Sequence, residues 1–202
     1  MTPFAAALTG GGAGLAGAVL AHVFTALFDR AGSEAWLKGP YGPPFFNIAV
    51  YTGLFYAAIG AATGRRAKEA LIGLLGPFLT IAVPMTALTR FARLGVYETA
   101  PSLEWKAVVS VVYLLAIWGT IAAIGASAAA KSRVLGAGAA VVASLLGYAI
   151  LDLFIRLAPS YAKSPWNPAG LIPSPINLMD GMLSGAALTL AVVFVQRRNH
   201  AR

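Results

Sequence analysis

The sequence of 202 residues contains no cysteine, only seven acidic residues and only two histidines. Without cysteine the chain forms no disulfide, no thiolate metal site and no iron–sulfur cluster. Charged residues make up 11% of the chain, against about 25% in a typical soluble domain. Two histidines and scattered carboxylates supply no ligand set with the spacing of a metal site. We therefore expect no metal, no cofactor and no ordinary soluble enzyme.

The formal net charge of +8 is compatible in sign with a nucleic-acid partner. The basic residues, however, flank long apolar runs, which is the distribution typical of membrane proteins. We expect the partners to be membrane lipids, together with other membrane subunits or further copies of the chain, and not nucleic acid.

Hydrophobic residues make up 58% of the sequence, and its mean hydropathy is +0.75. A helix that crosses the hydrocarbon core needs about 20 mostly apolar residues. Six runs bounded by charge or loop residues meet this need: Phe4–Phe28, Phe45–Thr63, Ala70–Thr89, Ala107–Ala130, Val134–Leu151 and Ile176–Val195. The first run is longer than the apolar part of a signal peptide, so we expect it to be a retained helix.

Six spans place the basic residues on two sides of the membrane. Eight lie at the short turns and the C-terminal tail: Arg65, Arg66, Lys68, Lys131, Arg133, Arg197, Arg198 and Arg202. Seven lie in or beside the longer loops: Arg30, Lys38, Arg90, Arg93, Lys106, Arg156 and Lys163. Because the first group is packed into short segments beside the helix ends, we place both termini in the cytoplasm, for a protein of the inner or plasma membrane. The position of Arg30 after the first helix favours the inverted topology.

A Phe-x-Arg pattern recurs with a period of 63 residues, at Phe28, Phe91 and Phe154. Each copy precedes a loop with one Tyr and one Trp, a second apolar helix and a basic cluster. Chance recurrence is the alternative explanation. Repeats of this parallel kind are related by an axis along the membrane normal. The predicted fold is an all-α integral membrane protein: six transmembrane helices as three tandem αα-hairpins with pseudo-threefold symmetry, in one membrane domain, 1–202, with repeats at about 4–68, 69–133 and 134–202.

Small residues are expected to hold the helices together, since lipid provides no hydrophobic drive between them. Three Gly-x-x-x-Gly pairs have the required spacing, beginning at Gly10, Gly60 and Gly181. Pro84 lacks a backbone N–H and is expected to kink the third helix.

The repeat predicts one candidate anion or headgroup site. If the symmetry holds, Arg30, Arg93 and Arg156 form a ring at one depth. Pointing inward, the guanidinium groups would bind phosphate or carboxylate. Pointing outward, they would reach toward lipid headgroups.

Three ionisable residues form a second candidate set, an intramembrane polar site. His22 would act as a ligand or proton relay, or else as a hydrogen-bonded structural residue. Asp152 stands four residues before Arg156, where an ion pair on one helix face is the plainer interpretation. Asp180 lies near the start of the last helix and faces either headgroups or an internal cavity.

Catalysis finds little support in the sequence. Ser127 follows Gly125 and Ala126 in a small-residue run like the serine turn of intramembrane proteases, but the sole candidate base, His22, lies toward the opposite face. We therefore expect a non-enzymatic scaffold or accessory subunit of a membrane complex, or a lipid-binding bundle. The alternative is a small-solute transporter or channel, for an anion among other solutes, with its pathway between the three hairpins.

Overall fold

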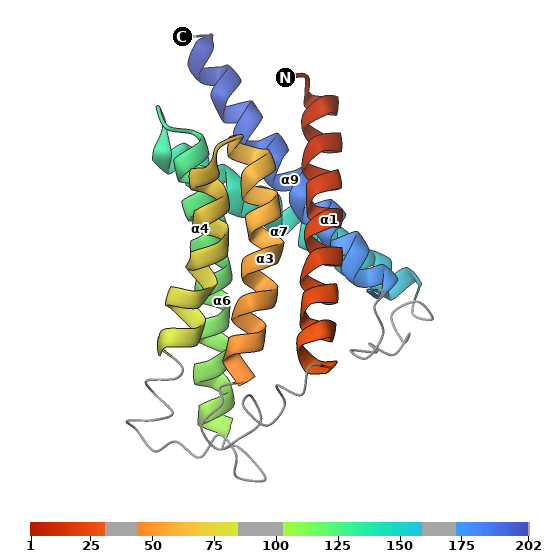
Figure 1. Cartoon of the computed structure of the whole chain (residues 1–202). Coiled ribbons are helices and arrows are strands. Elements are labelled where there is room, and N and C mark those ends of the chain that lie inside the picture. The colour runs from red at the N-terminus through yellow and green to blue at the C-terminus, as the bar shows by residue number, and fades with distance from the viewer. Residues whose placement is uncertain (31–43, 85–102, 159–172, 202) are drawn as a thin grey trace.

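The computed structural model describes residues 1–30, 44–84, 103–158 and 173–201. In this part of the chain all regular structure is helical (Figure 1). The elements are α1 (Pro3–Arg30), α3 (Pro44–Gly64), α4 (Ala67–Pro77) with its continuation η1 (Phe78–Ala82), α6 (Leu103–Ala128), α7 (Arg133–Leu157) and α9 (Pro175–His200). The predicted all-α class is confirmed.

Four of these helices are long and apolar enough to cross a membrane: Pro3–Leu27, Ser110–Ala128, Arg133–Leu157 and Pro175–His200. A shorter apolar helix covers Ile48–Gly64. Large apolar side chains such as Leu8, Leu115 and Phe194 are exposed on the outside of the bundle. A surface of this kind suits lipid, so the fold is that of a membrane protein.

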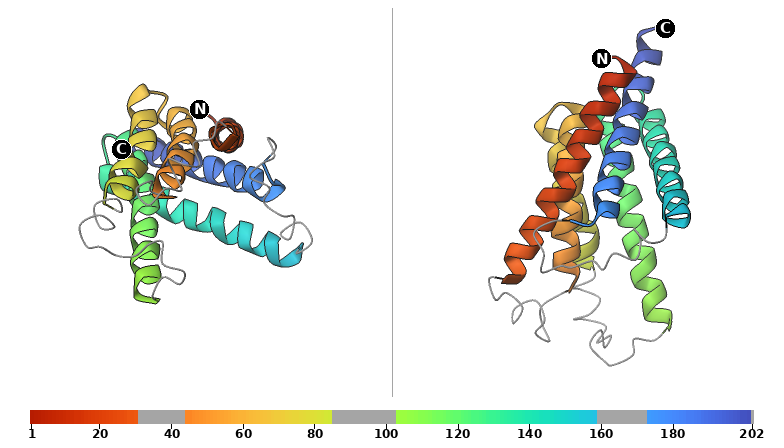
Figure 2. Two further views of the ribbon diagram at one scale, coloured as in Figure 1. Left: turned by 60° about the horizontal axis from the view of Figure 1, so that its bottom comes forward. Right: turned by 90° about the vertical axis from the view of Figure 1, so that its right-hand side faces the viewer.

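The helices follow one another around the bundle in chain order. Each packs against the helices before and after it, and α9 returns to α1, so that the six helical segments close a ring (Figure 2). α3 also contacts α6 and α9 across the ring. Helices α7 and α9 lie side by side, and α9 crosses α1 obliquely (Figures 1 and 2).

Both termini lie on the same side of the bundle as the turn between α3 and α4 and the turn between α6 and α7, a side that we call the terminal face (Figure 1). Arg197 donates a hydrogen bond to the carbonyl oxygen of Met1 over 2.8 Å. Gln196 donates to the carbonyl oxygen of Ala128 over 2.8 Å. These contacts tie the C-terminal helix to the N-terminus and to the end of α6.

Glycines bring the backbones of α1 and α9 into direct contact. A Cβ atom added at Gly14 would collide with the carbonyl oxygen of Gly181, and one added at Gly10 would collide with that of Gly185. Gly60 likewise packs on the carbonyl of the first turn of α4. The expectation that these Gly-x-x-x-Gly pairs permit close helix approach is confirmed.

The third helix is irregular between two prolines. Its α-helical part ends at Pro77, and the π-helix η1 occupies the next five residues. Pro84 has no N–H to donate to the carbonyl of Thr80, and a π-turn is a common way to relieve such a break. A widened π-helical turn is present between Pro77 and Pro84. The predicted kink at Pro84 stays a prediction, and the rest of the predicted run, up to Thr89, lies outside the described residues.

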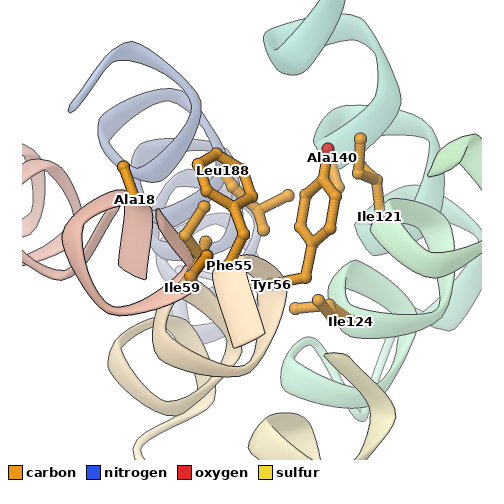
Figure 3. Close-up of a cluster of buried hydrophobic side chains, with 9 residues drawn as sticks. Ala18, Phe55, Tyr56, Ile59, Ile121, Ile124, Ala140 and Leu188 are labelled. Atoms are coloured by element: carbon orange, nitrogen blue, oxygen red, sulfur yellow. The ribbon is translucent and has the colours of Figure 1, made fainter. Parts of the chain in front are cut away.

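An apolar cluster fills the centre of the ring. It contains Ala18, Ala21, Phe55, Tyr56, Ile59, Ile121, Ile124, Ala140 and Leu188, and we call it the central cluster (Figure 3). Its members come from α1, α3, α6, α7 and α9. The middle of the bundle is thus packed mostly with apolar side chains.

The 63-residue repeat remains a prediction. Phe91 and Arg93 lie outside the described residues, and the side chains of Phe28 and Arg30 lie outside them as well. Their relative depths, on which the threefold symmetry depends, are therefore not described.

Substitution of Gly14 by alanine is expected to destabilise the α1–α9 contact, because the new Cβ atom collides with backbone that has no flexible end to move. Overpacking of this kind costs about 1–3 kcal/mol. Gly12→Ala is the matched control, since a Cβ there meets nothing within 4 Å, and a helical alanine is favoured over glycine by up to about 1 kcal/mol. Thermal unfolding in detergent should give a lower melting temperature for Gly14→Ala and an equal or higher one for Gly12→Ala. Equal melting temperatures for the two variants would contradict the contact.

Candidate functional site

Asp180 is carried by α9, whose beginning is well defined. The hydroxyl of Ser174 caps the helix by accepting a hydrogen bond from the backbone N–H of Asn177 over 3.3 Å, and Pro175 occupies the first helical position. Counting from Pro175, Asp180 is the sixth residue of the helix and lies in its second turn, near the start of the last helix as predicted.

The side chain of Asp180 faces the interior of the bundle. Gly181 contacts α1, while Asp180 shares a helix face with Ser184 and Leu188, which follow at intervals of four residues. Leu188 belongs to the central cluster. The hydroxyl of Ser184 donates a hydrogen bond to Oδ1 of Asp180 over 3.1 Å.

Three tyrosines on two other helices lie within electrostatic range of this carboxyl group. Asp180 interacts electrostatically with Tyr51 and Tyr56 on α3 and with Tyr113 on α6. A side-chain hydrogen bond joins Tyr113 to the buried Thr52. We call this group the Asp180 cluster: Asp180, Ser184, Tyr51, Thr52, Tyr56 and Tyr113.

The Asp180 cluster contains one acid and no base. Among the described residues no basic side chain pairs with Asp180, whose hydrogen-bond partner is Ser184. The basic residues of the turns and the C-terminal tail lie at the terminal face, beyond the other end of α9. A carboxylate inside a membrane bundle is costly unless an opposite charge or a proton compensates it.

Glu69 is a second interior acid, and the sequence analysis missed it. Its side chain is only 2% exposed. Oε1 accepts a hydrogen bond from the hydroxyl of Ser127 over 3.0 Å, whereas Oε2 has no hydrogen-bond partner among the described residues. Glu69 thus links the first turn of α4 to the last turn of α6.

Glycines create the space that Glu69 occupies. A Cβ atom at Gly64 would collide with the carboxyl group of Glu69, and one at Gly60 would collide with its backbone carbonyl. The sequence did carry a signal, because this Gly-x-x-x-Gly pair directly precedes the turn that leads to Glu69. Glu69 itself lies between the predicted runs Phe45–Thr63 and Ala70–Thr89, directly after the basic cluster that ends at Lys68.

The partner of Ser127 is therefore the carboxyl group of Glu69, which the sequence analysis did not consider as a base. His22 is buried on α1, with 2% of its surface exposed. Ser127 and Glu69 form a hydrogen bond between two helices, in a position enclosed by Gly64. No group of three or more His, Cys, Asp or Glu side chains within the described ranges could hold a metal ion.

Arg156 and Asp152 form the ion pair that their spacing predicts. Nε of Arg156 lies 2.7 Å from Oδ2 of Asp152, and the two side chains are 75% and 47% exposed. Exposed pairs of this kind contribute little to stability. The anion site of three arginines stays a prediction, since Arg93 and the side chain of Arg30 lie outside the described residues.

Replacement of Ser127 by alanine is expected to lower the stability of the bundle. It removes the donor to Oε1 of Glu69, whose Oε2 has no partner, so that both oxygens of a buried carboxyl group are left without a hydrogen bond. A buried polar group without its partner costs roughly 1–3 kcal/mol. Ser110→Ala, at an exposed position of the same helix, is the control. Thermal unfolding in detergent measures both variants, and an unchanged melting temperature for Ser127→Ala would show that the hydrogen bond is dispensable.

Comparison of this chain with family models, with curated proteins and with solved structures gives no match. The assignment of function therefore rests on the side chains themselves. What they provide is an apolar ring of helices with one acid, Asp180, bonded to Ser184 toward one end and a second acid, Glu69, bonded to Ser127 near the terminal face.

Proposed function

We propose that the chain is a six-span protein of the inner or plasma membrane, built as three tandem αα-hairpins with pseudo-threefold symmetry and with both termini in the cytoplasm. The closed ring in chain order supports the hairpin arrangement. The exposed basic residues of the turns and tail, gathered at the terminal face, support the orientation. In this arrangement α3 and α4 with η1 are the second and third spans.

We further propose that the protein is a non-enzymatic scaffold or accessory subunit of a membrane complex, or a lipid-binding bundle. The central cluster is the observation that carries this proposal. Aliphatic side chains from five helices meet there and close the centre of the described bundle by apolar packing. The apolar outer surface, with side chains such as Leu115 and Leu146 exposed, is then where lipids or partner helices bind.

A second candidate function is a pathway for a small solute between the hairpins. The Asp180 cluster favours it, because ionisable residues inside membrane bundles commonly mark the routes of ions and substrates. The solute would have to pass the level of Ile59 and Leu188 in the central cluster.

Native mass spectrometry of the detergent-purified protein is expected to show bound partner subunits, a homo-oligomer or retained lipid. Each of these follows if the apolar outer surface is a binding surface. A monomer without lipid or partner would contradict the scaffold and lipid-binding proposal.

Single cysteines distinguish the two candidate functions, and the natural chain contains no cysteine to interfere. At Ile59→Cys, in the middle of the central cluster, we expect no reaction with a water-soluble thiol reagent, because water does not reach this level. At Arg66→Cys, in the exposed turn between α3 and α4, we expect rapid reaction with reagent supplied from the cytoplasmic side. Reaction at Ile59→Cys in the folded protein would favour the solute pathway. Reaction at Arg66→Cys only with reagent supplied from outside the cell would show that the termini face outward, opposite to the proposed orientation.

A further inference from the structure

Basic side chains are concentrated at the terminal face, where the described residues hardly offset their charge. Seven of them are exposed: Arg65, Arg66, Lys68, Lys131, Arg133, Arg197 and Arg198. The one described acid on this side is Glu69, whose carboxyl group is buried and bonds Ser127 inside the bundle. The other described acids, Asp152 and Asp180, lie toward the opposite ends of α7 and α9. An excess of positive charge on one surface attracts anions.

Two of these arginines converge on one residue. Nη2 of Arg65, in the turn between α3 and α4, donates a hydrogen bond to the sulfur of Met1 over 2.8 Å. Nη2 of Arg197, near the end of α9, donates to the carbonyl oxygen of Met1 over 2.8 Å. Two positive charges from distant parts of the chain are thus held near the same residue, although like charges repel. Because a guanidinium group has five N–H donors, most donors of both groups remain available to an anion.

The backbone of Arg65 is strained. Its φ angle is +57°, and it is the one non-glycine residue with a positive φ in the described part of the chain. Helices often end with glycine in this conformation, because a side chain there is disfavoured. The bond to Met1 does little to offset this strain, since a thioether sulfur is a weak acceptor. A ligand of the guanidinium group would account for an arginine at this position.

Exposed apolar side chains lie next to the two arginines along their helices. Phe4, three residues after Met1, is exposed at the start of α1. Phe194, three residues before Arg197, is exposed on α9, and residues three apart share a helix face. A ligand with a phosphate group at the guanidinium groups and hydrocarbon beside the phenylalanine rings matches both features. A phospholipid is built in this way, whereas a small anion would use only the charged part.

We propose that Arg65 and Arg197 bind the phosphate group of an anionic phospholipid, whose acyl chains lie along α1 and α9. Guanidinium groups form charge-assisted hydrogen bonds with phosphate, and basic clusters beside the ends of membrane helices attract anionic lipids. This site deepens the lipid-binding form of the proposed function and rests on it, by naming the class of lipid and the place where it binds. It differs from the predicted ring of arginines, whose member Arg156 lies toward the opposite end of the bundle.

Native mass spectrometry of the full-length, delipidated protein in detergent tests the site. The protein is mixed with equal amounts of phosphatidylglycerol and phosphatidylcholine that carry identical acyl chains. We expect phosphatidylglycerol to bind about tenfold more tightly, because the choline group offsets the phosphate charge of the other lipid. Equal affinities would overturn the anionic-lipid site and leave the lipid-binding function intact. Absence of both lipids would contradict the lipid-binding function as well.

Inorganic phosphate distinguishes a lipid headgroup from a free anion. Added in excess over the lipid, it is not expected to displace phosphatidylglycerol, because it lacks the acyl chains that lie along the helices. Displacement of the lipid would show that the arginines bind a small anion, and it would overturn the assignment to a phospholipid.

Two double variants locate the binding. Arg65→Gln combined with Arg197→Gln is expected to bind the two lipids equally. Lys131→Gln combined with Arg133→Gln removes the same charge from the terminal face, at the turn between α6 and α7, and should keep the preference for phosphatidylglycerol. An equal loss in both double variants would show that only the overall charge of the face matters, and it would overturn the site.

The control pair lies on the other side of α9 from Met1. Ser132, between the two control residues, donates a hydrogen bond to Oδ1 of Asn199 over 3.1 Å. Asn199 follows Arg197 by two residues, which turns its side chain by about 200° around the helix. The helix therefore separates the turn between α6 and α7 from the proposed site.

Arg65→Gly keeps the test decisive if the double variant does not fold. Glycine adopts a positive φ without strain, so the melting temperature without lipid should equal or exceed that of the natural chain. Its affinity for phosphatidylglycerol is expected to fall about fivefold, in line with the loss of one basic group near the membrane surface. An unchanged affinity for phosphatidylglycerol in this variant would overturn the proposal.

Discussion

The structure depends on how closely α1 and α9 approach each other. Lipid provides no hydrophobic driving force for helix association, so the contact relies on van der Waals packing. This packing is closest at glycines, where the two backbones can approach each other directly. At Gly14 and Gly181 the two backbones touch directly, and this contact closes the ring that begins and ends with these helices. It also fixes the rotation of α9. Since consecutive helical residues are turned by about 100°, the contact of Gly181 with α1 directs Asp180 toward the inside.

The interior that results has a mostly apolar centre and carries its two acids toward opposite ends. Toward the terminal face, the hydroxyl groups of Thr63 and Thr189 are hydrogen-bonded over 2.9 Å, and Ser127 bonds Glu69. Toward the other end lies the Asp180 cluster. Nine residues of α9 separate Asp180 from Thr189, which corresponds to about 14 Å along the axis. The central cluster lies between these levels and separates the two acids by side chains that carry no charge.

The combination of an apolar centre with acids toward both ends explains why a structural function and a transport function are the two candidates. An apolar middle suits a bundle that only has to be stable and to present its outer surface to lipids or partner helices. Acids with incomplete hydrogen bonding or without a counter-ion are unusual in a purely structural core, because each weakens the bundle unless something compensates it. The two features meet in the same helices, since α3 and α9 contribute both to the central cluster and to the Asp180 cluster.

By itself the sequence determined the class of fold, the location of the helices and the glycines that join them. Long apolar runs without charge have few alternatives to membrane helices. The fifth predicted run overlaps its helix, which begins at Arg133, one residue before the predicted Val134, and extends to Leu157, six residues beyond the predicted Leu151. It also indicated the Asp152–Arg156 pair, because residues four apart share a helix face. What only the tertiary structure decided is which polar residues are enclosed together. Glu69 bonds Ser127 only because helices that are distant in sequence pack side by side. The rotation of each helix about its axis is set by this packing, which no local sequence pattern encodes.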